Sequence, residues 1–229
     1  MASIILIPGA GGEAFDWNWV RPLLEERGHD VVAVDLPAGD ESAGIDEYAD
    51  TVVAAIGNRV APVLVAQSMG GFTAAAVAER IPVRLIVFVN AMVPIPGETA
   101  GEWWAATGQA AAERAAAVAD GRDPDAEFDV VETFFHDVPA ERVAEVMARP
   151  APAQSNRPFG SSVGDGWMHV PARAVAGSLD RMFPLPMMQA MYRERLGVEP
   201  DVIESGHMTG HSRPEELASL ITKYIEELG

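Results

Sequence analysis

Short apolar runs recur along the chain, each bounded by Gly, Pro or Asp. Six of them are rich in β-branched residues and have the length of a strand that is buried on both faces, rather than that of a helix. They cover Ser3–Pro8, Asp30–Leu36, Pro62–Gln67, Val83–Asn90, Val170–Ala176 and Glu199–Ser205. Segments with the helical period separate them, at Trp19–Arg27, Ile45–Arg59, Gly70–Arg80, Leu185–Leu196 and Pro214–Leu228. This alternation predicts an α/β protein with an open, mostly parallel sheet and helices on both faces.

One stretch, residues 93–169, interrupts the alternation. It contains no convincing strand, and its helical segments fall at Gly101–Ala119, Glu127–Asp137 and Ala140–Arg149. A loop of about 75 residues without structure of its own is uncommon in a compact domain. We therefore predict a helical insertion at 93–169 that lies over one edge of the sheet, with the core formed by residues 1–92 and 170–229.

Composition and charge narrow the class of protein. The 229 residues are 48% apolar and include no cysteine, which excludes disulfides, thiolate catalysis and cysteine-based zinc sites. With 16 Lys and Arg against 34 Asp and Glu, the net charge is −18, which disfavours nucleic acid and anionic membranes as partners. The first apolar run, Met1 to Ile7, is shorter than a signal-peptide core or a membrane span. We expect a cytoplasmic monomer or homodimer.

The third predicted strand leads into a serine between small residues, Ala66-Gln-Ser68-Met-Gly70, and then into a helix. A serine on a sharp turn from strand to helix needs small residues two positions before and after it, because the turn brings backbone segments close together. Such a turn projects Ser68 away from the sheet and places the helix N-terminus behind it, where N–H groups can stabilise an oxyanion. Taken alone, the same serine also fits a helix N-cap.

A glycine-rich loop, Pro8 to Gly12, follows the first predicted strand. Its spacing matches neither G-x-G-x-x-G nor G-x-x-x-x-G-K-[ST], and Lys223 is the only lysine in the chain, so a phosphate site is disfavoured. An oxyanion hole formed by the backbone N–H groups of Ala10 and Met69 needs only what this loop and the serine turn provide.

An acid and a base follow the fifth and sixth predicted strands. Asp180 lies in the loop after the fifth, and His207 lies in the loop after the sixth. Because catalytic groups of open α/β sheets gather at the carboxyl ends of the strands, these loops can converge with Ser68 on one site. Asp180 also fits a simple turn or cap residue, an alternative that stays open here.

A second histidine, His211, lies four residues after His207. On a helix the two would face the same way and suggest a metal pair, but Gly206 and Gly210 disfavour a helix and no carboxylate has the spacing to complete the site. We choose His207 as the base, because it directly follows the strand and Gly206. His211 is expected to border the last helix.

With Ser68, Asp180 and His207 in this order on a β-α-β framework, nearly the whole chain resembles the α/β-hydrolase superfamily. Within it, the chain is most similar to the small capped esterases related to plant methyl-ester hydrolases and hydroxynitrile lyases. The resemblance implies that Ser68 is the nucleophile, His207 the general base and acid, Asp180 its orienting carboxylate, and the N–H groups of Ala10 and Met69 the oxyanion hole. It also makes 93–169 a cap domain and implies the strand order 2-1-3-4-5-6. We expect no cofactor and no metal.

Three residues depart from the family pattern: Ala66 replaces the first elbow glycine, Gln67 a common histidine, and Pro8 the usual His-Gly start of the oxyanion loop. Pro8 removes an N–H and a side chain that often braces that loop. Met208 and Gly9 occupy the positions where cyanohydrin-cleaving members typically carry lysine and threonine, which favours the esterase branch.

An apolar pocket is expected around the site, from cap residues and from residues after the acid. The candidates are Trp103, Trp104, Phe134, Phe135, Met147, Phe159, Met182 and Phe183, although most of them also suit core packing. Without a basic cluster in the cap, a neutral ester, thioester or lactone is the expected substrate. A ligand-binding or receptor protein with the same pocket, or a lyase or perhydrolase, is the alternative.

Overall fold

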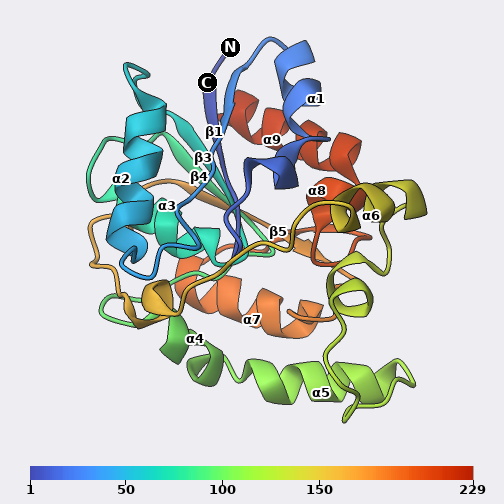
Figure 1. Ribbon diagram of the computed structural model, residues 1–229. Coiled ribbons are helices and arrows are strands. Elements are labelled where there is room, and N and C mark those ends of the chain that lie inside the picture. Colours follow the sequence, from blue (N-terminus) through green and yellow to red (C-terminus); the bar gives the residue numbers. More distant parts are fainter. Residues whose placement is uncertain (229) are drawn as a thin grey trace.

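The computed structural model describes residues 1–228 and contains one six-stranded sheet, in which every neighbouring pair of strands is parallel (Figure 1). The strands are β1 (Ser3–Ile7), β2 (Asp30–Ala33), β3 (Val63–Gln67), β4 (Leu85–Val89), β5 (Ala172–Gly177) and β6 (Asp201–Ile203). Their order, β2-β1-β3-β4-β5-β6, confirms the expected order and the predicted α/β class. All six predicted strands exist, several of them shorter by one to three residues at an end.

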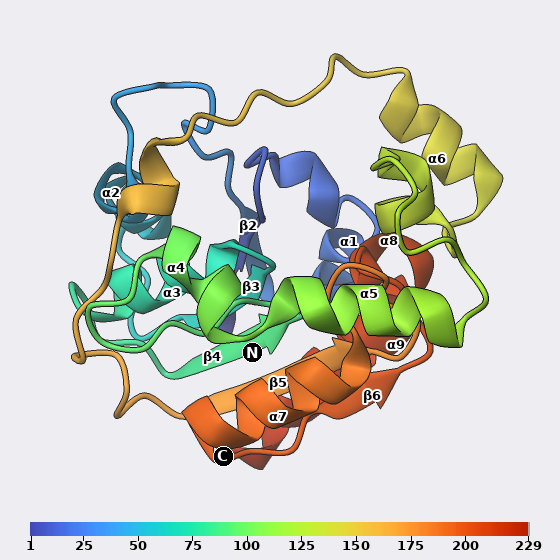
Figure 2. The ribbon, with the colours of Figure 1, turned by 90° about the horizontal axis from the view of Figure 1, so that it is seen from below.

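Helices cover both faces of the sheet (Figures 1 and 2). Alternate strand residues face opposite sides, so Ile4 and Leu6 pack with α1 (Arg21–Glu26) and α9 (Pro214–Glu227). Their neighbours in β1 pack on the other side, with three further helices of the core. These three are α2 (Ile45–Ile56), α3 (Gly70–Ala78) and α7 (Leu185–Leu196).

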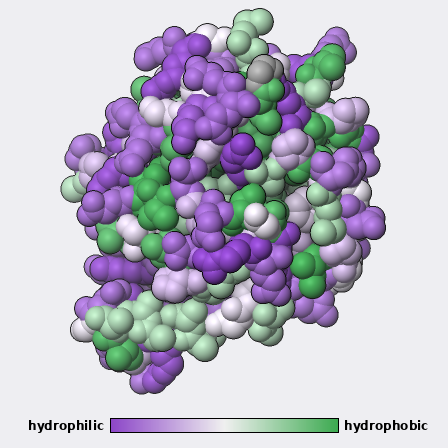
Figure 3. Space-filling view, turned by 180° about the vertical axis from the view of Figure 1, so that it is seen from behind, coloured by the Kyte–Doolittle hydropathy of each residue, from purple (hydrophilic) through white to green (hydrophobic). Residues whose placement is uncertain are grey.

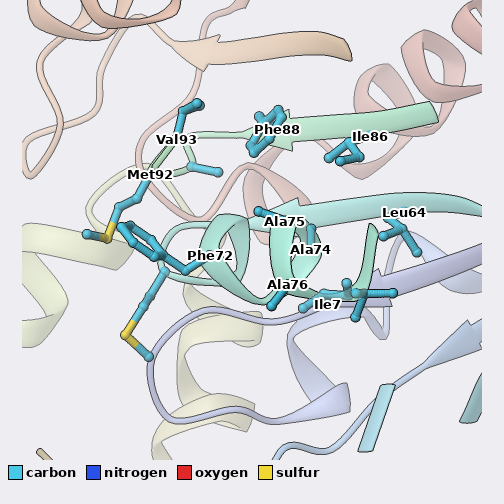
Figure 4. Packing of buried hydrophobic residues seen from close by; sticks show 14 of the residues in the cluster. Ile7, Leu64, Phe72, Ala74, Ala75, Ala76, Ile86, Phe88, Met92 and Val93 are labelled. Carbon is cyan, nitrogen blue, oxygen red and sulfur yellow. The ribbon is translucent and has the colours of Figure 1, made fainter. Parts of the chain in front are cut away.

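Helix α3 is buried over its whole length. Figure 4 shows its Phe72 and Ala74 to Ala76 between apolar residues of the central strands and the segment after β4. Small residues let the helix approach closely: a Cβ on Gly71 would collide with the carbonyl group of Met92. The helix that follows Ser68 is therefore fixed by tight packing.

Between β4 and β5 the chain forms the helical segment, residues 93–169. It contains α4 (Ala100–Ala106), α5 (Gln109–Ala119), the π-helical turn η2 (Val131–Phe135), α6 (Ala140–Met147) and the short 3-10 helix η3 (Arg157–Gly160). Figure 2 shows α5 running across the molecule near α7, with α6 beside the short helix α8 (Thr209–Ser212). Seen from behind in Figure 3, the surface is mostly hydrophilic, and apolar colour spreads over the lower edge formed by α5.

The helices of this segment differ from the prediction at their ends. The single stretch expected at 101–119 is broken where Gly108 adopts a left-handed backbone with a φ of 67°. Only residues 131–135 of the stretch expected at 127–137 are helical. The broken stretch forms two short helices, because a left-handed residue cannot continue an α-helix.

Burial separates the expected pocket residues into groups. Trp103 and Phe183 are fully buried in the main core and Phe135 is buried as well, so these three belong to the packing. Trp104, Phe134, Phe159 and Met182 are half-buried, while Met147 is exposed.

Candidate active site

Ser68 follows β3 at the sharp turn into α3, and its φ is 52°. Its N–H donates to the carbonyl of Val89, and its own carbonyl accepts from Gly71 and Met92. A residue with a Cβ in this left-handed region is strained by about 1–3 kcal/mol, and such strain persists only when the surroundings impose it. The turn thereby fixes the direction of the hydroxyl group.

Two glycines make room for this turn. A Cβ on Gly70 would lie 2.5 Å from the carbonyl oxygen of Pro8. A Cβ on Gly9 would lie 2.8 Å from the Cβ of Ser68 and 2.6 Å from Oε1 of Gln67. The oxyanion-loop candidate and the serine turn are therefore in direct contact, and only glycine fits at either position.

His207 lies between Ser68 and Asp180. Its Nε2 is 3.1 Å from the Ser68 hydroxyl oxygen, and its Nδ1 is 2.8 Å from Oδ2 of Asp180. The other carboxylate oxygen of Asp180 accepts from the N–H groups of Met182 and Phe183, each at 2.9 Å. The side chains of His207 and Asp180 are 2% and 0% exposed. Because the carboxylate accepts a hydrogen bond from Nδ1–H, the unprotonated Nε2 is the nitrogen that can accept the serine proton.

Two aromatic rings from different parts of the chain flank the imidazole of His207. Phe183, directly after the acid loop, meets it nearly edge-on with ring centroids 5.0 Å apart. Phe134, from η2 of the helical segment, lies 5.3 Å away between ring centroids. The plane of the imidazole is therefore fixed by packing as well as by hydrogen bonds.

Asn90 is a residue of the site that the sequence did not single out. Its Nδ2 donates to the carbonyls of Gly206 and His207, at 3.1 and 3.0 Å, and its Oδ1 accepts from Gly177. Asn90 has a φ of 43°, a conformation that asparagine tolerates better than most residues. It ties the end of β4 to the end of β5 and to the histidine loop. The signal in the sequence is an asparagine at the end of a buried strand.

The N–H groups of Ala10 and Met69 donate to no other group of residues 1–228. Ala10 is exposed in the glycine-rich loop, and Met69 lies at the N-terminus of α3. Neither donor is thus engaged by another group in this part of the chain.

The glycine-rich loop is braced by a residue distant in sequence, Gln154. Its Oε1 accepts from the N–H of Gly11 at 2.9 Å, while its Nε2 donates to the Tyr48 hydroxyl and to the carbonyl of Ser155. A Cβ on Gly11 would lie 2.9 Å from Pro152. The end of the helical segment therefore supplies a side chain, that of Gln154, which supports the loop. Pro8, at the start of the loop, has no side chain that could form such a hydrogen bond.

His211 does not join the site. Its ring is buried between Trp19 and Phe135, and neither ring nitrogen has a partner within residues 1–228. Burial lowers the pKa of His211 to about 4, and the nearby positive charge of Arg142 adds to the effect. As expected, this histidine borders α9, and it is neutral near pH 7.

Asp16 lies just after the glycine-rich loop, in the 3-10 helix η1 (Ala14–Trp17). Burial, together with the nearby negative charges of Glu13 and Asp35, raises the pKa of Asp16 to about 7, although the positive charge of Arg149 opposes the shift. Within residues 1–228, no group of three or more histidines and carboxylates is arranged to hold a metal ion. In the same part of the chain, no helix is long and apolar enough to cross a membrane.

Comparison with known proteins identifies relatives along the whole fold. The model of the alpha/beta hydrolase family matches residues 4–220. A pyrethroid hydrolase of Sphingobium wenxiniae is 26% identical over 254 aligned positions, covering 99% of this chain and 88% of that protein.

Plant relatives match a shorter region. Norfluorocurarine synthase 1 of a Strychnos species is 35% identical over 102 residues, which cover 39% of this chain and 38% of that protein. Methyl jasmonate esterase 1 of Vitis vinifera is 34% identical over 104 residues, covering 40% of each chain. The chain thus spans about two fifths of the length of these plant relatives.

Solved structures share the fold over nearly the whole chain. The crystal structure of polyneuridine aldehyde esterase has a TM-score of 0.81 at 19% identity, covering 98% of this chain and 99% of that one. The pyrethroid hydrolase of Sphingobium faniae has a TM-score of 0.77 at 22% identity, with 98% and 97% covered.

Proposed function

Because the chain belongs to the alpha/beta hydrolase family, we propose that it is a serine hydrolase that cleaves a small, neutral carboxylic ester, thioester or lactone through an acyl-enzyme. The observation that carries the proposal is the hydrogen-bonded series Ser68, His207 and Asp180, with the serine on a strained turn. A serine hydroxyl is a weak nucleophile until a base accepts its proton and an acid orients that base.

In the proposed reaction, His207 takes the proton of Ser68 through Nε2 as the serine oxygen attacks the ester carbonyl carbon. The N–H groups of Ala10 and Met69 stabilise the oxyanion, while Asp180 holds Nδ1–H and stabilises the imidazolium. His207 then gives the proton to the leaving alcohol, and the acyl group stays on Ser68. In the second half, His207 takes a proton from water as the water oxygen attacks the acyl carbon, and the bond from that carbon to the Ser68 oxygen then breaks as His207 returns the proton to the serine, which releases the acid.

The relatives support an ester as the substrate, since two of them are named methyl jasmonate esterase and pyrethroid hydrolase. Within this proposal the helical segment, 93–169, is the cap over the site, and the reaction requires neither cofactor nor metal. The expected cytoplasmic location and the monomer or homodimer state stay predictions.

The name norfluorocurarine synthase 1 shows that a relative is not named for hydrolysis, so a lyase, a perhydrolase or a ligand-binding protein is the alternative. Met208, beside the catalytic histidine candidate, lies against the Gln67 amide, where it supplies no positive charge. This arrangement favours hydrolysis over cyanide-releasing chemistry.

Steady-state hydrolysis of p-nitrophenyl esters from acetate to octanoate tests the proposal. We expect Ser68→Ala to lower kcat by about 10⁶-fold and Asp180→Asn by roughly 10⁴-fold, by analogy with other triads. Ser212→Ala is the matched control, because its buried hydroxyl has no partner within residues 1–228 and lies outside the triad. Full activity in folded Ser68→Ala would refute the proposal.

A further inference from the structure

Two adjacent side chains of the helical segment bond to the backbone of the two loops that carry Asp180 and His207. Oδ2 of Asp137 accepts from the N–H of Gly206 at 2.7 Å, and Nε2 of His136 lies 3.0 Å from the carbonyl oxygen of Leu179. Gly206 directly precedes His207, and Leu179 directly precedes Asp180. Asp137 thus holds the residue before His207, and His136 holds the residue before Asp180.

The contact with the histidine loop leaves no room for a side chain. A Cβ on Gly206 would lie 2.5 Å from Oδ1 of Asp137 and 3.1 Å from Nε2 of His136. The two loops also bond to each other, since the N–H of Leu179 donates to the carbonyl of Ser205. The side chains of His136 and Asp137 therefore close a junction between the loops.

The side chains at this junction include a buried polar atom that lowers the stability of the fold. Oδ1 of Asp137 is buried without a partner within residues 1–228, although burying a polar atom unpaired is unfavourable. The carbonyl of Leu179 can only accept, so His136 must carry a proton on Nε2. A carboxylate that accepts a backbone N–H forms a charge-assisted bond, roughly twice as strong as a neutral one.

A local irregularity aims these side chains. They directly follow η2, a π-helical turn, and π-helical turns occur frequently at functional sites. Phe134 of the same turn contacts the imidazole of His207. Three of four consecutive residues, 134 to 137, therefore meet the catalytic loops.

We propose that His136 and Asp137 are positioning residues, which hold the two loops so that His207 stays aligned between Asp180 and Ser68. The proposal rests on the serine-hydrolase function proposed above. The helical segment would then have a second role besides covering the site, because its side chains would help to hold His207 and Asp180 in place. Misplacement of a catalytic group by about 1 Å can lower the rate about 100-fold.

Kinetics of paired variants test this role. We expect Asp137→Ala and His136→Ala to lower kcat about 10- to 100-fold with KM changed less than about twofold. The reason is that both changes disturb the alignment of His207, while neither removes a contact with the substrate. Asp137→Asn keeps an acceptor for Gly206, and His136→Gln keeps a donor for Leu179, so both should recover most of the activity. Thr133→Ala, on the same turn, is the control and should match the wild type.

A readout without turnover separates this proposal from the proposed function. Proton NMR should show a far-downfield imidazole N–H resonance from the His207–Asp180 bond, which is lost in His207→Gln and weakened or shifted in Asp137→Ala. An unchanged resonance and unchanged kcat in folded Asp137→Ala and His136→Ala would overturn the positioning role. Loss of activity in Asp137→Asn equal to that in Asp137→Ala would also overturn it. A wild type with the resonance but no hydrolase activity would instead refute the proposed function.

Discussion

Replacing Ser68 by glycine should give a more stable protein than replacing it by alanine, although neither variant retains the hydroxyl group. Both changes remove the 3.1 Å hydrogen bond between Ser68 and His207. Alanine keeps a Cβ at a φ of 52°, whereas glycine adopts this conformation without steric strain. The pair of variants therefore isolates the strain of the turn from the loss of the hydroxyl.

The expected difference follows from two opposing contributions. A Cβ in the left-handed region costs roughly 1–2 kcal/mol. The greater freedom of glycine in the unfolded chain offsets about 0.5–1 kcal/mol of that gain. From the midpoints of these two ranges, Ser68→Gly should exceed Ser68→Ala in free energy of unfolding by about 0.75 kcal/mol, which corresponds to about 1.5–3 °C in Tm for a domain of this length.

Urea and thermal unfolding of the two variants, followed by circular dichroism, measure this difference. Ala61→Gly serves as the control, because Ala61 also has a positive φ, 44°, and lies outside the site. It should gain stability of a similar size. If Ala61→Gly is stabilised while Ser68→Gly is no more stable than Ser68→Ala, the turn stores no strain and the argument for a preorganised nucleophile is refuted.

Three further predictions concern the surroundings of the site. Gln154→Ala should lower kcat about five- to tenfold in ester kinetics, since the N–H of Gly11 loses an acceptor worth about 1 kcal/mol, and an unchanged kcat would contradict this role. Arg195 of α7 and Glu98 form an ion pair whose side chains are 7% and 5% exposed. Arg195→Met should lower the free energy of unfolding by about 3–5 kcal/mol in urea titrations, because the charge of Glu98 is left buried without its partner; a loss below about 1 kcal/mol would contradict this. His211 has a native pKa of about 4, below its unfolded value of 6.5, so it binds fewer protons when folded and its contribution to the free energy of unfolding should fall by about 2–3 kcal/mol as pH falls from 7 to 4.5, whereas Asp16, whose pKa is raised to about 7, changes in the opposite direction. The free energy of unfolding of the wild type minus that of His211→Phe should therefore fall by about 2–3 kcal/mol from pH 7 to pH 4.5 in urea titrations, and an unchanged difference would contradict the assignment to His211.

The sheet could be predicted from the sequence because its signals are local. Buried parallel strands form continuous β-branched runs, and the glycines and the serine at their ends mark where each strand stops. The strand order followed from the family resemblance and is confirmed. The structure brings Ser68, Asp180 and His207 together, and their catalytic roles remain predictions that experiment must test.

The supporting residues could not be predicted, because their partners lie far away along the chain. Gln154 braces a residue 143 positions before it, and Asp137 bonds to a residue 69 positions after it. Nothing in the local sequence around either residue indicates such a contact. The burial of Trp103 could not be predicted either, because an aromatic residue of a helical segment suits a pocket as well as a core. The structure places Trp103 in the core.

The most direct test of the account is labelling with a fluorophosphonate probe, followed by peptide mass mapping, because the probe reports an activated serine without knowledge of the substrate. We expect the wild type to be labelled at Ser68, and labelling to disappear in Ser68→Ala and to fall sharply in His207→Ala. Labelling at another serine, or none in the folded wild type, would contradict the assignment of Ser68 as a nucleophile activated by His207.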